Sequence, residues 1–273
     1  MKYIAALLFV LLSHAALADN GLTVTIGKVE KKFTAAALLA RPETREIEID
    51  DPSYQKPVKY RAIPVKALLA GMKLPPDAVI EAVANDGFVA QLPTDLLLQP
   101  KSGASEAYLA IEPPDARWPV LPGKKASAGP FYLVWLNPAA TGIRSEQWPY
   151  MVAALRSADS PAKRWKELAV DKSLPADSPI RTGQALYVTQ CMACHKLNGA
   201  GSADVGPDMN RPASPTEYFQ PDALKKYIRD PASLRRWDGM QMPGFGKDAL
   251  SDHEIDLIIS YLGHMAANRK PAK

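Results

Sequence analysis

The stretch Cys191-Met192-Ala193-Cys194-His195 decides how the C-terminal part of this chain folds. The spacing Cys-x-x-Cys-His is the attachment signal of a c-type haem. Two thiols one helical turn apart can form thioethers with the two vinyl groups of a porphyrin, and the next histidine can ligate the iron. We therefore predict one covalent haem c on Cys191 and Cys194, with His195 as the proximal iron ligand.

A Cys-x-x-Cys pair can also form a disulfide, half of a zinc site or a redox pair of the thioredoxin type. A structural zinc site needs four ligands, and no second Cys-x-x-Cys pair occurs in the chain. A thioredoxin motif follows a strand in a βαβ pattern, which the sequence before Cys191 does not show. The adjoining His195 favours haem attachment over these alternatives.

The residues around the motif resemble a class I c-type cytochrome domain. The stretches that carry the resemblance are, in chain order, Thr182 to Tyr187, Gly206-Pro207, Met242-Pro243-Gly244-Phe245 and Leu250 to Ile255. The resemblance implies an all-α domain over residues 178–273 that encloses one haem. It also implies that the carbonyl of Pro207 accepts a hydrogen bond from the second ring nitrogen of His195, which fixes the tautomer.

The sixth iron ligand has to come from a residue after the haem motif. We predict Met242, because it matches the Met-Pro sequence that supplies this ligand in the family. Met240 is the rival, although a methionine there can also fill a gap at the haem edge. A thioether ligand favours ferrous iron and raises the reduction potential relative to a second imidazole. The remaining candidates are Met209, Met265, His253 and His264.

The C-terminal residues predict an amphipathic helix. Ser251 and Glu254 fit a capping box, and apolar residues from Ile255 to Leu262 recur at the spacing of one helix face. Five basic residues precede this helix, interleaved with acidic ones. We interpret them as a solvated helix face, with a docking patch for an acidic redox partner as the alternative: Lys225, Lys226, Arg229, Arg235 and Arg236.

Residues 19–160 predict a mixed, mostly β domain. Short β-rich segments alternate with turn residues about every dozen positions, and Asn85-Asp86-Gly87 predicts the turn of a hairpin. Residues 161–177 lack periodicity and are expected to be a linker. The predicted fold class is therefore α+β with two domains, the second an all-α class I cytochrome c domain. The expected strands cover residues 22–26, 45–50, 78–84, 88–92, 107–111 and 131–136, and residues 147–156 are a candidate for one further element.

The N-terminal domain is similar to the sulfite-oxidase-type molybdopterin-binding domain. The similar stretches are residues 61–69, 85–88 and 129–134. That family holds molybdenum through a cysteine thiolate, but no cysteine occurs here before Cys191, and Asp50 or Asp51 lies roughly at its place. A carboxylate cannot replace a soft thiolate without changing the metal chemistry. We therefore expect no molybdenum and a docking or ligand-binding module.

Residues 1–18 predict a secretory signal peptide. Lys2 precedes an apolar run, and Ala16-Leu17-Ala18 offers a cleavage site near Ala18. The apolar run is too short to span a bilayer comfortably. We expect export to the periplasm and no transmembrane segment after cleavage. The formal net charge of +4 is too small to predict nucleic-acid binding.

Together these patterns favour an exported mono-haem cytochrome that transfers single electrons between periplasmic redox partners, such as a dehydrogenase or a terminal reductase. The first alternative is the haem subunit of a pterin-dependent oxidoreductase. The second is a sensor in which an open sixth position binds a gas. No residue is assigned a catalytic role.

Overall fold

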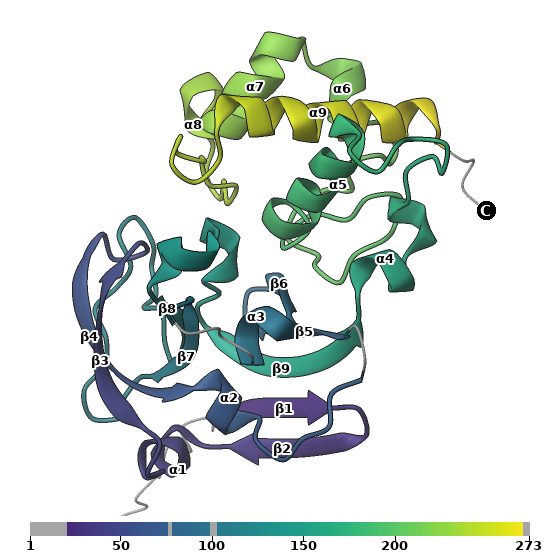
Figure 1. Cartoon of the computed structure of the whole chain (residues 1–273). Coiled ribbons are helices and arrows are strands. Elements are labelled where there is room, and N and C mark those ends of the chain that lie inside the picture. The colour runs from purple at the N-terminus through teal and green to yellow at the C-terminus, as the bar shows by residue number, and fades with distance from the viewer. Residues whose placement is uncertain (1–20, 76–77, 99–102, 270–273) are drawn as a thin grey trace, which may run out of the picture.

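The computed structural model describes residues 21–75, 78–98 and 103–269. A β-rich N-terminal domain and a helical C-terminal domain lie against each other (Figure 1). This confirms the predicted fold class. The signal peptide predicted for residues 1–18 lies outside the described residues.

The strands of the N-terminal domain form two sheets in the described part of the chain. One sheet has the order β2-β1-β9-β5-β6, and the other has the order β3-β4-β7-β8. Strands β1 and β9 pair in parallel, and the other neighbours are antiparallel. All six expected strands are confirmed, as β1, β3, β5, β6, β7 and β8. The strand bounds are β1 Leu22–Ile26, β2 Val29–Phe33, β3 Arg45–Asp51, β4 Lys56–Pro64, β5 Ala78–Ala84, β6 Val89–Pro93, β7 Glu106–Ile111, β8 Phe131–Leu136 and β9 Val152–Asp159.

Large aromatic side chains fill the core between these sheets. Trp135, Tyr60 and Tyr132 are fully buried, and the indole N–H of Trp135 donates to the carbonyl of Gln147 over 2.8 Å. Buried aromatic groups of this kind contribute a large share of the apolar area removed from water. Three short helices pack against strands of these sheets: α1 Ala35–Leu39, α2 Val65–Leu68 and α3 Thr94–Leu98.

The helical domain is built on the crossing of α5 (Pro179–Gln190) and α9 (Asp252–Ala267). Gly183 permits this crossing, because a Cβ atom there would lie 2.1 Å from the carbonyl oxygen of Leu257. The capping box predicted for α9 is confirmed, and its apolar face is buried. The remaining elements are η1 Pro138–Thr141, η2 Ser145–Gln147, α4 Pro161–Arg164, η3 Lys166–Leu168, α6 Pro215–Tyr218, α7 Pro221–Arg229 and α8 Pro231–Leu234.

The segment expected to be a linker, residues 161–177, folds against the helical domain. Leu168 and Val170 are buried in the core of that domain. The carbonyl of Leu168 accepts hydrogen bonds from the Tyr261 hydroxyl at 2.8 Å and from the Gln184 amide at 2.7 Å. Much of this segment is therefore held in place rather than free to swing. Over the ranges that the structure describes, no helix combines the length and the apolar character needed to cross a membrane.

Candidate haem site

The haem motif, residues 191–195, directly follows α5 and forms one tight turn. The N–H groups of His195 and Cys194 both donate to the carbonyl of Cys191, at 2.9 and 3.1 Å. Both cysteines are free thiols rather than a disulfide. The structure thus brings the three predicted residues Cys191, Cys194 and His195 into one turn, as two thioether bonds and an iron–imidazole bond to a single haem require.

The imidazole of His195 is oriented by the backbone. Its Nδ1 lies 2.8 Å from the carbonyl oxygen of Pro207. A carbonyl can only accept, so Nδ1 carries the proton and Nε2 is left as the nitrogen with a free lone pair. Burial lowers the pKa of His195, although the Pro207 carbonyl opposes this. The ring is therefore held neutral, with the nitrogen that a metal needs unprotonated.

Gly206 lets the chain pass directly beside this ring. A Cβ atom at residue 206 would lie 2.3 Å from Cε1 and 2.5 Å from Nδ1 of His195. The N–H of Gly206 donates to the carbonyl of Cys194 over 2.8 Å, which ties the loop to the motif. Met209, one of the candidate ligands, lies in the same loop and packs against the core of the helical domain. Together the thiols, the oriented imidazole and the close glycine fit a covalently attached haem.

A comparison with known protein families agrees with this geometry. Residues 180–266 match the family model of cytochrome c. The helical part of the chain is thus a cytochrome c domain, which implies haem-based electron transfer. The match does not extend into the N-terminal β-rich domain. No curated protein matches the chain.

The two methionines considered as sixth ligand lie in the methionine loop of the cytochrome domain, residues 235–250, between α8 and α9. Met240 and Met242 are both partly buried, and Phe245 is buried in the core. The haem motif and the methionine loop are thus separate loops of one domain. Met242 stays the predicted sixth ligand, with Met240 as its rival.

Arg229 braces the methionine loop from the end of α7. Its guanidinium donates to the carbonyl of Phe245, to that of Leu250 at 2.6 Å and to the carboxylate of Asp252 at 2.7 Å. In return, the N–H of Phe245 donates to the carbonyl of Arg229 over 3.1 Å. The interpretation of Arg229 as part of a solvated face was therefore wrong, because its side chain turns inward to the loop. Arg235 and Arg236 are exposed.

The N-terminal domain contacts the cytochrome domain at the haem motif. The N–H of Val89, at the start of β6, donates to the carbonyl of Ala193 over 3.0 Å. Ala193 stands between the two haem cysteines. A Cβ atom added to Gly87 would lie 3.5 Å from the side chain of Val205, so the hairpin turn also lies close to the loop after the motif. The β5–β6 hairpin is thus part of the immediate surroundings of the site.

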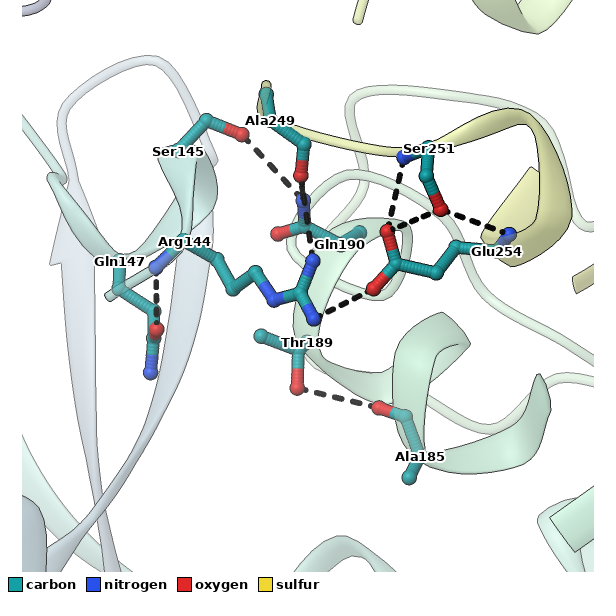
Figure 2. Close-up of polar contacts among 9 residues, drawn as sticks. All are labelled: Arg144, Ser145, Gln147, Ala185, Thr189, Gln190, Ala249, Ser251 and Glu254. Carbon is teal, nitrogen blue, oxygen red and sulfur yellow. Dashed lines mark hydrogen bonds and ion pairs between the residues drawn. The ribbon is translucent and has the colours of Figure 1, made fainter. Parts of the chain in front are cut away.

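A second contact joins η2 and the residue before it to the C-terminal end of α5 and the N-terminal end of α9 (Figure 2). The guanidinium of Arg144 donates to Glu254 over 2.6 Å and to the carbonyl of Ala249 over 3.4 Å. The amide of Gln190 lies 3.5 Å from the hydroxyl of Ser145. Hydrogen bonds from Arg144 and Ser251, working against burial, lower the pKa of Glu254 to about 2.

A third contact centres on Glu81 of β5, which is buried. Its carboxylate accepts from Arg164 and from the hydroxyl of Ser202, each over 2.6 Å. The guanidinium of Arg156 and the side-chain amide of Gln91 also donate to this carboxylate, over 2.6 and 2.8 Å. Burial alone would raise the pKa of Glu81, but these hydrogen bonds outweigh it and lower the pKa to about 2. Ser202 belongs to the loop after the haem motif, so this carboxylate joins the two domains.

Both haem thiols lie where burial suppresses their ionisation. Burial, and then the charge of Glu146, raise the pKa of Cys191 to about 12. The same two causes raise the pKa of Cys194 to about 12, with a further contribution from Asp86 and an opposing one from Lys124. Glu146, Asp86 and Lys124 all belong to the N-terminal domain, and sequence patterns alone gave no signal that they lie near the motif.

Asp51, one of the two aspartates expected roughly at the place of a molybdenum-binding cysteine, is buried at the end of β3. Its carboxylate accepts from the Tyr60 hydroxyl at 2.7 Å and from the N–H groups of Ser53 and Tyr54 at 2.8 Å each. Its oxygens are therefore already occupied by internal donors. Among the residues that the structure describes, no group of three or more His, Cys, Asp or Glu side chains is arranged to hold a metal ion.

Proposed function

We propose that this chain is an exported mono-haem c-type cytochrome that transfers single electrons between periplasmic redox partners. The observation that carries the proposal is the turn of residues 191–195, in which two free thiols stand beside an imidazole oriented by the Pro207 carbonyl. A bound haem would supply one-electron chemistry, its iron changing between the ferrous and ferric states. Cys191 and Cys194 would hold it covalently.

The residues of the chain would hold the site in one geometry through the redox cycle. The bond from Nδ1 of His195 to Pro207 fixes the ring orientation and raises the basicity of Nε2. Arg229 holds the loop that contains Met242, the proposed distal ligand, by its bonds to two carbonyls of that loop. A fixed ligand set keeps reorganisation small when the charge of the iron changes.

The N-terminal domain would serve as a docking or ligand-binding module without molybdenum. The domain resembles the sulfite-oxidase-type domain but has no cysteine thiolate to bind molybdenum. The carboxylate of Asp51 already accepts hydrogen bonds from Tyr60 and two backbone donors. The partner would be a periplasmic dehydrogenase or a terminal reductase, and the signal peptide of residues 1–18 would direct the export. No nucleic acid is expected among the partners.

The test is expression of the full chain in a bacterial host with active c-type haem maturation. We expect a periplasmic protein with the absorption bands of a reduced c-type cytochrome and a reversible one-electron titration. Metal analysis of the same sample should find one iron and no molybdenum. Absence of c-type bands would contradict the haem assignment, and stoichiometric molybdenum would favour the pterin-dependent oxidoreductase instead.

A further inference from the structure

Glu146 is an acidic residue of the N-terminal domain whose chain neighbours are anchored to the cytochrome domain. Two residues that precede it make these contacts. Arg144 donates to the carboxylate of Glu254, and the hydroxyl of Ser145 faces the amide of Gln190 (Figure 2). Gln190 directly precedes Cys191. The η2 segment that carries Glu146 is therefore fixed against the end of α5 where the first haem thiol follows.

The charge of Glu146 acts on both haem thiols. After burial, it is the largest cause of the raised pKa of Cys191 and of Cys194. Lys124, from the same domain, acts on Cys194 in the opposite direction. Thioethers do not titrate, so once a haem is attached only the charges themselves would act. Glu146 follows Ser145, whose hydroxyl lies 3.5 Å from the amide of Gln190, the residue before Cys191.

Glu146 is only partly exposed, so water screens its charge less and its electrostatic effect on nearby groups is larger. Burial raises its pKa to about 7, and the nearby Lys124 opposes this rise. A charge that water and salt screen poorly acts over a longer distance than a charge at an open surface. Above pH 8 the carboxylate is mainly ionised and carries its full negative charge beside the site.

We propose that the N-terminal domain forms one wall of the haem pocket and that the Glu146 carboxylate lowers the midpoint potential of the haem. This inference rests on the proposed haem-binding function. Cys191 and Cys194 would hold the haem directly after the end of α5, against which the segment that carries Glu146 is fixed. A negative charge there stabilises the ferric state, which carries one more positive charge than the ferrous state. The β-rich domain thereby tunes the redox centre of its neighbour.

The test is the midpoint potential of full-length, haem-loaded variants at pH 9. Glu146→Gln should raise the potential, with about a tenfold change in the ferrous-to-ferric ratio at fixed solution potential, or about 59 mV. Glu146→Asp keeps the charge and should stay close to the wild type. Lys124→Gln should give a smaller shift of opposite sign. The control Glu30→Gln removes an exposed carboxylate on β2, the edge strand at the other end of the sheet from β6, and should cause no shift.

The outcomes separate this inference from the proposed function. Normal c-type bands in every variant, with equal potentials in wild type, Glu146→Gln and Glu30→Gln, would overturn the role of Glu146 and leave the haem assignment intact. Equal shifts in Glu146→Gln and Glu146→Asp would also overturn it, because they would indicate altered packing rather than lost charge. A wild-type protein without c-type bands would contradict the proposed function itself.

Discussion

The backbone N–H of Val89 donates to the carbonyl of Ala193 over 3.0 Å. This bond joins the β5–β6 hairpin of the N-terminal domain to the residue between the two haem cysteines. A hydrogen bond at the centre of the motif means that the β-rich domain and the candidate haem site share one structural environment. The N-terminal domain is therefore part of the surroundings that a bound haem would experience, and not a separate module on a flexible tether.

Replacing Glu81 by Gln should destabilise the protein at neutral pH. The change removes the buried charge that Arg156, Arg164 and Ser202 share. We expect a loss of about 3 kcal/mol in the free energy of unfolding, the size typical of a broken buried ion pair. Guanidinium unfolding measures it. The control Glu48→Gln alters an exposed residue of β3 and should change the stability by less than about 0.5 kcal/mol.

The contribution of Glu81 should depend on pH in a defined direction. Its pKa is about 2 in the folded chain, against a usual value of 4.5. Because the folded pKa is the lower one, the stabilisation is complete above pH 4.5 and is lost as the pH falls towards 2. The difference in stability between wild type and Glu81→Gln should therefore shrink over that window. A difference that stays constant down to pH 2 would contradict the assignment.

Gly206→Ala should impair the site without disturbing the N-terminal domain. The added methyl group would meet the His195 ring at 2.3 Å, so the ring or the loop must move. We expect a loss of about 1–3 kcal/mol in stability, typical of overpacking, and a reduced yield of haem-loaded protein. The control is Gly263→Ala in α9, where nothing lies within 4 Å of the added Cβ. Equal haem yields in the two variants would contradict the close packing.

Arg229→Met should loosen the methionine loop. The variant leaves the carbonyls of Phe245 and Leu250 without their guanidinium donor. We expect a loss of about 1–3 kcal/mol in the free energy of unfolding and faster proteolytic cleavage within residues 235–250. Arg235→Met, which alters an exposed residue nearby, is the matched control. Cleavage of both variants at the wild-type rate would show that Arg229 does not brace the loop.

Met242→Ala and Met240→Ala should differ if Met242 is the distal ligand. Loss of a thioether ligand removes the preference for ferrous iron that it confers. We therefore expect Met242→Ala to change the absorption spectrum and lower the midpoint potential, and Met240→Ala to leave both near the wild type. The reverse pattern would assign the ligand to Met240. No change in either variant would favour the sensor with an open sixth position.

Local sequence signals predicted much of the fold. The capping box of Ser251 and Glu254 and the alternating strands each depend on residues a few positions apart. The strand β2 was not predicted, because most of its residues are exposed and no apolar alternation marks it. The packing of residues 161–177 was also missed, since two buried apolar residues, Leu168 and Val170, make no periodic pattern.

The surroundings of the site could not be read from local patterns. Arg144 and Glu254 are 110 positions apart, and Ser202 lies 121 positions from Glu81. Such pairs depend on how two domains meet, and a charged residue gives no local sign of its distant partner. The motif itself, in contrast, needs only five consecutive residues, so the sequence alone was enough to predict its chemistry.

The most direct test of the central claim is the mass of the intact, matured protein, followed by mass spectrometry of the peptide that contains residues 191–195. We predict a mass increase equal to one haem, with the adduct on both Cys191 and Cys194 and lost in the double variant Cys191→Ala/Cys194→Ala. Two alkylatable thiols and no porphyrin adduct, in protein from a host that matures a control c-type cytochrome, would contradict the account.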